Sequence, residues 1–250
     1  MTMLMLLAAV APALIILRLL IKLDRFPEPT HLIVKTFVLG MLVTIPVGAT
    51  GFFLPQLLES IGHPVTRSLV TAFIATAAPE ELAKFCVLYF YCMRKDEFDE
   101  PMDGLVYGLA ASLGFACLEN ILYLVGAGEN WPTLALIRGL LTVPGHGMDG
   151  IIMGFFAALG RFDAPRRGQW FFMALAFPML CHGFYDWPIF LIDDPAAEDN
   201  STIAGLLLLL PIAVVIVQLV WSIRLLRRLN RLQAQTMAGR PVSVAQLVGD

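Results

Sequence analysis

The chain has 250 residues, of which 58% are hydrophobic and 15% are charged, and its formal net charge is −3. Soluble domains carry about 25% charged and about 45–50% apolar residues, so this composition excludes an ordinary soluble domain and indicates an integral membrane protein. The weakly acidic balance gives no reason to expect a nucleic-acid partner. The four cysteines form no CxxC pair, which argues against a disulfide framework and against a thiolate zinc site.

Seven apolar stretches are long enough to cross the core of a lipid bilayer, which takes about 20 helical residues. We predict transmembrane helices over residues 2–22, 33–58, 67–93, 104–126, 133–160, 170–192 and 203–226. The first helix has its positive charges at the far end, unlike a cleaved signal peptide, so we expect the chain to keep it. The connectors are short, which predicts one all-α, polytopic membrane domain over residues 1–235 and a short cytoplasmic tail over residues 236–250.

Lysine and arginine gather around alternate connectors, and this asymmetry predicts the orientation of the helices. Basic residues flank the first, third and fifth connectors and follow the last helix, whereas the opposite side has only Arg67 and Arg138. We therefore predict a multi-pass protein of the cell (inner) membrane, with its N-terminus outside and its C-terminus in the cytoplasm. The basic segment RLLRRLNRLQ, residues 224–233, is expected to extend the last helix beyond the membrane.

Charged side chains interrupt the third predicted helix in the stretch AAPEELAKF. This stretch places Glu80, Glu81 and Lys84 about 13 residues from the start of the helix, near its middle. Polar residues of the next three helices fall about 12 to 15 residues from the starts of theirs: Glu119, His146 and His182. At a rise of about 1.5 Å per residue, all these groups lie in one slab of the membrane. We expect them to meet in a shared wet pocket away from lipid.

Residues three or four positions apart share one face of a helix. By this rule Lys84 can reach both glutamates of its helix, His146 shares a face with Asp149, and His182 shares one with Asp186. The group holds five acids against one lysine and two histidines, and an ionised side chain at mid-membrane costs about 2.5–3.5 kcal/mol on insertion scales. The excess charge must be protonated, hydrated in a cavity or balanced by a metal cation.

Purely structural roles are the alternatives for these residues. A lysine can pair with a glutamate only to pack two helices, the two aspartates can lie near the interface or orient a neighbour, and a core histidine can be hydrogen-bonded without any catalytic role. Small residues gather on the fourth and fifth helices and favour close helix packing. The sequence PGHG, residues 144–147, is also expected to break the fifth helix locally at His146.

This set of residue types suits hydrolysis by an activated water. A buried carboxylate can act as the general base, and a histidine can stabilise the oxyanion that forms on the attacked carbonyl. Alternatively, Glu119, His146 and His182 could bind zinc, which accepts nitrogen and oxygen ligands and leaves one position open for water. No HExxH motif is present to favour the metal.

Four motifs on successive helices, PEELAKF, GFACLENILY, PGHGMDG and CHGFYDW, together resemble the PrsW family of intramembrane proteases, and DRFPEP after the first helix fits the same pattern. The resemblance spans about residues 24–187, and the family is distantly similar to the CAAX prenyl proteases. It implies a membrane-embedded endopeptidase that cleaves membrane-anchored proteins, and some family members are linked to anti-sigma-factor processing. Such proteases are described both as metalloproteases and as glutamic-type enzymes, so the resemblance leaves open whether the site uses zinc or no cofactor.

The resemblance assigns roles position by position. Glu80 and Glu81 match the paired glutamates of the family and Lys84 the basic residue of that motif, while Glu119 matches the glutamate of FxxxE. His146 and His182 match the two motif histidines. The chain differs from the CAAX enzymes in having Lys84 in place of a later arginine and Glu119 in place of a histidine, which leaves the water-activating pair open.

The resulting hypothesis has Glu80 or Glu81 activating a water that Glu119 and His146 hold, with or without a metal. His182, oriented by Asp186, stabilises the oxyanion, and the lysine neutralises the glutamate pair.

Two other functions remain possible from the residues alone. Intramembrane acids also line the paths of ion-coupled transporters, although the chain shows no internal repeat, and the same fold could serve as a non-catalytic scaffold for other membrane proteins.

Overall fold

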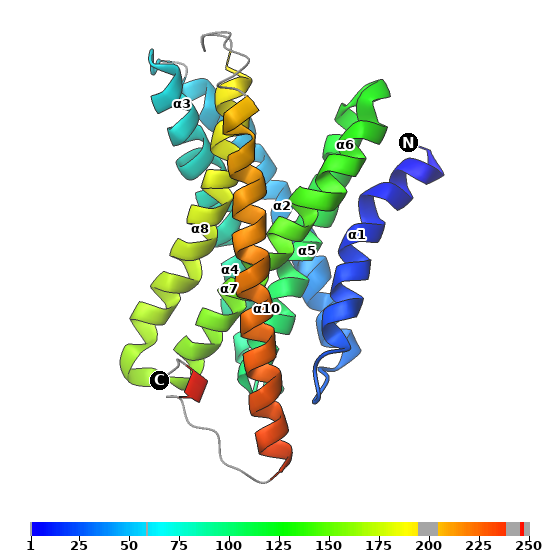
Figure 1. Cartoon of the computed structure of the whole chain (residues 1–250), viewed down its shortest axis with the longest axis vertical. Coiled ribbons are helices and arrows are strands. Elements are labelled where there is room, and N and C mark those ends of the chain that lie inside the picture. The colour runs from blue at the N-terminus through cyan, green and yellow to red at the C-terminus, as the bar shows by residue number, and fades with distance from the viewer. Residues whose placement is uncertain (1, 59, 195–204, 239–245, 248–250) are drawn as a thin grey trace.

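The computed structural model describes residues 2–58, 60–194, 205–238 and 246–247, and every regular element in these ranges is helical (Figure 1). The long helices are α1 (Met3–Ile21), α2 (Thr30–Leu58), α5 (Pro101–Gly126), α8 (Arg167–Ile192) and α10 (Leu209–Met237). Two further segments are composite: α3 (Pro64–Val70), η1 (Thr71–Ala77) and α4 (Ala78–Phe90) follow one another directly, as do α6 (Trp131–Ile137), η4 (Arg138–Thr142) and α7 (Val143–Phe162). The predicted all-α architecture is confirmed.

Five helices of the described ranges are long and apolar enough to cross a membrane: Met3–Ile21, Thr30–Thr50, Pro101–Gly126, Ala164–Ile192 and Gly205–Met237. The third and fifth predicted spans correspond to the two composite segments, whose individual pieces are not among these five. Residues 203–204 of the seventh predicted span and most of the predicted tail lie outside the described residues. The last helix continues to Met237, so the basic segment extends it as expected.

The two composite segments share one local design. In each, a π-helical turn, η1 or η4, is followed by an α-helix with proline at its second residue, Pro79 in α4 and Pro144 in α7. Proline lacks an N–H and its ring clashes with the carbonyl four residues earlier, and a wide π turn at that point relieves the clash. The prediction that PGHG itself breaks the fifth helix is wrong in position, because the irregular turn precedes it and PGHG begins the regular part of α7.

Helix α5 is the central helix of the bundle, and most of its side chains are buried. Glycines bring α5 and α7 into backbone contact: a Cβ added at Gly104 would collide with the carbonyl of Gly154, and one at Gly108 with the carbonyl of Gly150. On its other side, α5 meets α2 in the same way, with Gly40 against the backbone of α5. This close packing fixes the depth of α5 and α7 relative to each other, which sets the position of the polar residues that they carry.

The outward faces of the helices are apolar. Leu7 and Leu14 of α1, Phe172 of α8 and Ile216 of α10 are each about half exposed or more. Such a surface suits lipid rather than water. The N-terminal end of α1 lies at one end of the bundle and the C-terminal end of α10 at the other (Figure 1).

Candidate active site

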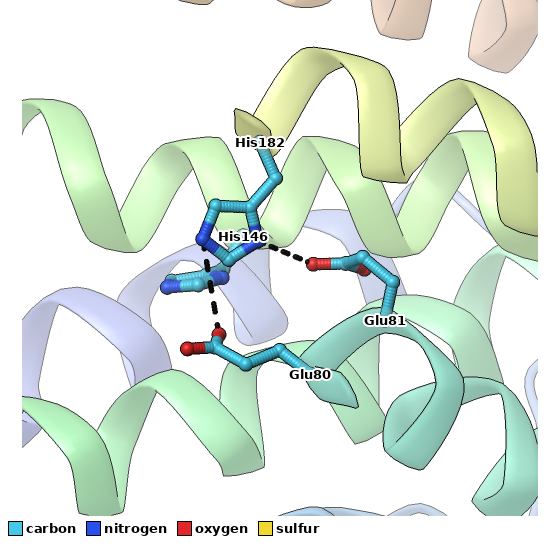
Figure 2. Close-up of side chains that lie close together, drawn as sticks. All are labelled: Glu80, Glu81, His146 and His182. Carbon is cyan, nitrogen blue, oxygen red and sulfur yellow. Dashed lines mark hydrogen bonds and ion pairs between the residues drawn. The ribbon is translucent and has the colours of Figure 1, made fainter. Parts of the chain in front are cut away.

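Side chains from three helical segments converge inside the bundle. Glu80 and Glu81 from α4 point toward His182 of α8, and His146 of α7 lies next to them (Figure 2). The rings of the two histidines are 5.1 Å apart between centroids, with their planes nearly perpendicular. All four residues are buried, with at most 7% of their surface exposed. The shared polar pocket that the sequence predicted is therefore present, and it lies away from lipid.

Lys84 connects two of these helices. Its Nζ lies 2.7 Å from Oε1 of Glu81, 3.6 Å from Oε2 of Glu80 and 2.9 Å from Nδ1 of His146. The ammonium also lies over the ring of Phe115, 4.4 Å from its centroid, in a cation–π contact. A fully buried ammonium is stable only with such partners, so Lys84 draws the paired glutamates and His146 into one hydrogen-bonded unit that keeps an excess of negative charge.

His182 lies between carboxylates on two sides. Its Nδ1 is 2.7 Å from Oε1 of Glu81, and its Nε2 is 3.2 Å from Oδ2 of Asp186 and 3.8 Å from Oε2 of Glu80. Asp186 is one turn further along α8, as its spacing from His182 predicted. The carboxylates fix the plane of the imidazole, so His182 presents a defined edge to Glu80.

Glu119 holds His146 from the side opposite to Lys84. Oε2 of Glu119 lies 3.0 Å from Nε2 of His146 and 2.7 Å from Nη2 of Arg138. Arg138 also donates from Nε to Oδ1 of Asn120 at 2.9 Å, and the Asn120 amide donates to the carbonyl of Ala9 in α1. This network ties α1, α5, η4 and α7 together and fixes the position of His146.

Helix α10 closes one side of the site through Gln218. The amide of Gln218 donates to Oδ1 of Asp149 at 2.6 Å, and both side chains are buried. Close by, the hydroxyls of Thr142 and Tyr185 lie 2.8 Å apart. The cavity between these residues, His146 and His182 has room of only about 10 Å³, roughly that of one water molecule.

The site has a donor set that suits a metal ion. One ligand atom from each of four residues, two carboxylate oxygens and two imidazole nitrogens, lies within 4.8 Å of the other three: Glu80, Glu81, His146 and His182. Oε2 of Glu80 and Oε2 of Glu81 are buried without a hydrogen-bond partner among the described residues. Two imidazoles and two carboxylates are ligands that zinc accepts. Glu119, expected in the metal site, is not part of this group, because it lies beyond His146.

Sequence reasoning missed two polar residues of the site. It placed Arg138 near the membrane surface, but 93% of this arginine is buried and its guanidinium pairs with Glu119. The signal was its position about five residues inside an apolar run, where an arginine needs a partner. Gln218 was also missed, although it is an uncharged polar residue in the middle of the last apolar stretch. Both residues contact side chains that the sequence did single out.

Comparison with known proteins agrees with this geometry. The family described as PrsW family intramembrane metalloprotease matches residues 28–220. Protease PrsW of Geobacillus kaustophilus is 36% identical over 181 residues, which cover 72% of this chain and 77% of that protein.

Other relatives match the same share of the chain. Protease PrsW of Bacillus subtilis is 36% identical over 182 residues, 72% of this chain and 80% of that protein. Protease PrsW of Clostridioides difficile is 27% identical over 187 residues, 72% of this chain and 77% of that protein. No solved structure matches the chain significantly. The helical membrane bundle, its buried glutamate and histidine site and these matches agree, and the chain belongs to the PrsW family of intramembrane metalloproteases.

Proposed function

We propose that Glu80 is the base that activates the attacking water when this intramembrane protease hydrolyses a peptide bond. The observation that carries the proposal is the difference between the paired glutamates. Glu81 Oε1 is held at 2.7 Å by both Lys84 and His182, whereas Glu80 Oε2 approaches these two residues only to 3.6 and 3.8 Å and has no hydrogen-bond partner among the described residues. Oε2 of Glu81 is also unpartnered, but its other oxygen is fixed by two hydrogen bonds, whereas Glu80 is the glutamate of the pair that is free to take up a proton.

The reaction then follows from the positions of these side chains. The Glu80 carboxylate accepts a proton from a water molecule as its oxygen attacks the carbonyl carbon of the substrate. The Nε2–H of His182, which faces Asp186 before substrate binds, donates its hydrogen bond to the oxyanion. The carboxyl group of Glu80 then gives the proton to the leaving nitrogen as the C–N bond breaks. Glu81 stays ionised throughout because the ammonium of Lys84 lies beside it. Its role is to hold Lys84 and His182 in place.

The remaining polar residues are positioning residues in this proposal. Asp186 orients His182. Glu119 orients His146, with Arg138 neutralising its charge, and Asp149 fixes the position of α10 through Gln218. Each of them acts through another side chain rather than on the substrate. A positioning role for Glu119 replaces its expected role as a metal ligand.

A metal ion fits the same site. Glu81, His146 and His182 would hold it, and the buried free oxygens of the glutamate pair favour a cation there. We propose zinc, since the donors are nitrogen and oxygen. When bound, it would supply Lewis-acid polarisation and additional positive charge. The roles of Glu80 as base and of Lys84 as charge partner remain the same.

The substrate class follows from the position of the site. The catalytic residues are enclosed by membrane-spanning helices, so the cleaved bond must come from a membrane-anchored protein, for which anti-sigma factors remain the suggested example. The basic residues at the C-terminal end of α10 support an outside N-terminus and a cytoplasmic C-terminus.

The test compares Glu80→Gln with Glu81→Gln in proteoliposomes, with a single-span reporter protein that the wild type cleaves. We expect Glu80→Gln to lower the cleavage rate by about 10²–10⁴-fold while its melting temperature stays close to that of the wild type. Glu81→Gln is expected to lower both the cleavage rate and the melting temperature. Glu129→Gln, an exposed change in a connector, is the control that should alter neither. Cleavage at the wild-type rate by Glu80→Gln would rule out Glu80 as the base.

A further inference from the structure

A second group of acidic residues lies at the end of the bundle where α1 ends and α5 begins. We call it the connector cluster, and its members come from the first connector and the start of α5: Asp24, Glu28, Glu100 and Asp103. It is separate from the active site, because Asp103 and Glu119 are 16 positions apart on α5, or about 24 Å along the helix. Neither the catalytic proposal nor the metal site above uses these residues.

The carboxylates of the cluster converge. One oxygen atom from each of Asp24, Glu100 and Asp103 lies within 4.8 Å of the other two. Glu28 lies beside them and accepts a hydrogen bond from the hydroxyl of Tyr107. Asp103 is completely buried, and Asp24 and Glu28 are less than 10% exposed. The cluster is therefore a buried site rather than a solvated acidic surface.

In two of these carboxylates one oxygen is fixed and the other has no partner. Oδ2 of Asp103 accepts from the backbone N–H groups of Asp99 and Glu100 at 2.9 and 2.7 Å, and Oδ1 of Asp24 accepts from the N–H of Phe26 at 3.0 Å. Oδ1 of Asp103 and Oδ2 of Asp24 are buried without a hydrogen-bond partner among the described residues. Buried polar atoms are normally satisfied, so Oδ2 of Asp24 lacks a ligand, and the carboxyl group of Asp103 lies close enough to that of Glu28 for the two to share a proton or a cation.

The charge of the cluster is also uncompensated. No lysine or arginine in the described ranges forms an ion pair with its members, and the guanidinium of neighbouring Arg25 instead donates to Oδ1 of Asn230. Gathering these carboxylates without a cation therefore has a cost in free energy.

We propose that the connector cluster binds one divalent cation of the class that prefers oxygen ligands, Mg²⁺ or Ca²⁺. All its donors are carboxylate oxygens, and it offers neither imidazole nor thiolate, so its chemistry differs from that of the zinc-type set in the active site. Mg²⁺ retains several waters and needs few carboxylates, whereas Ca²⁺ takes about 6–8 oxygens. The two free oxygens of Asp24 and Asp103 are the first ligands of either ion.

The cation would join three parts of the chain. Asp24 belongs to the first connector and Asp103 to α5, while Gln233 of α10 donates its amide to Oδ1 of Asp24 at 2.7 Å and also to Glu100. The same helix carries Gln218, which contacts Asp149 at the active site 15 positions earlier, or about 22 Å away. Occupancy of the cluster therefore holds α10 in the position that closes the active site.

The experiment uses the full-length protein in detergent, with His146→Ala and His182→Ala introduced to remove the histidine ligands of the active site. After treatment with a chelator and dialysis, MgCl₂ and CaCl₂ are titrated separately, and the melting temperature and the amount of bound ion are measured. We expect one of the two ions to bind once per chain and to raise the melting temperature by at least about 3 °C at saturation. The outcome does not depend on proteolytic activity.

Two double variants identify the site. Asp24→Asn with Asp103→Asn should abolish binding and the thermal shift, whereas Asp96→Asn with Glu97→Gln, which removes two exposed acids of the third connector, should preserve both. The proposal is overturned if neither ion binds or shifts the melting temperature of the parent protein. It is also overturned if the shift persists in the Asp24 and Asp103 variant. Should that variant fail to fold, the single variants Asp24→Asn and Asp103→Asn decide, and each should weaken binding of the ion.

Discussion

Lys84 Nζ lies 2.7 Å from Oε1 of Glu81 one turn earlier on the same helix, and neither side chain is exposed to any degree. A buried ion pair of this kind contributes little net stability, but removing one partner leaves the other charge without compensation. The pair therefore makes the integrity of the active site depend on both residues at once.

Replacing Lys84 with methionine should destabilise the protein by about 3–5 kcal/mol, since Glu81 would keep a buried charge with His182 as its one remaining partner among the described residues. Adding Glu81→Gln to Lys84→Met should recover part of this loss, because that buried charge is then removed. The check is a double-mutant cycle of thermal unfolding in detergent. Strictly additive losses would show that the two residues do not act as a pair.

Arg138 should be required for activity although it touches neither glutamate of the pair. Arg138→Leu leaves Glu119 buried with only His146 as a partner, so we expect the cleavage rate to fall at least about 10-fold and the protein to lose about 2–4 kcal/mol of stability. Arg138→Lys keeps the charge and should restore part of the rate. Arg67→Leu, which changes an arginine outside the catalytic network, is the comparison. If the leucine and lysine variants at position 138 cleave equally well, the charge of Arg138 has no positioning role.

Gly154 should not tolerate a side chain. In Gly154→Ala the new Cβ meets the carbonyl of Gly104 and lies 3.1 Å from Cα of Leu105, so α7 must move away from α5. We expect a loss of at least about 1–3 kcal/mol together with a loss of activity, because His146 is carried on α7. Gly48→Ala is the matched control, since a Cβ there meets no atom within 4 Å. A wild-type melting temperature for Gly154→Ala would contradict the close approach of these helices.

The metal assignment predicts one zinc ion per chain in purified wild-type protein. His146→Ala combined with His182→Ala should remove it, whereas the variant at Asp24 and Asp103 should keep it. Elemental analysis measures the zinc content of both variants. In the wild type, a chelator should abolish cleavage until zinc is returned. Full cleavage by metal-free protein would show that the glutamate and histidine residues work without zinc.

The sequence was sufficient to predict the helices and the depth of the polar residues. Hydropathy located the apolar runs, and equal depth in different helices placed Glu81, His146 and His182 in one slab. The spacing of four between His182 and Asp186 predicted their contact, which is present at 3.2 Å. These predictions succeed because rise per residue and helix periodicity are local properties of the chain.

The facing of the helices could not be predicted in this way. Helix rotation depends on glycine contacts between α5 and α7 that bring together residues far apart in sequence, so Arg138 could not be assigned to Glu119, nor Gln218 to Asp149. The π turns were missed for a similar reason. Proline in PGHG indicated an irregularity, but the strain of a proline appears in the preceding turn, where the sequence RGLLT of η4 looks like ordinary helix.

The small size of the cavity beside His146 and His182 has a consequence for turnover. Room for about one water molecule cannot also admit a peptide carbonyl, so α10 must move away from α7, or α8 from η4, before any bond is cut. The site in this conformation is therefore too small for a substrate peptide. Opening it requires that two hydrogen bonds, Gln218 to Asp149 and Thr142 to Tyr185, come apart.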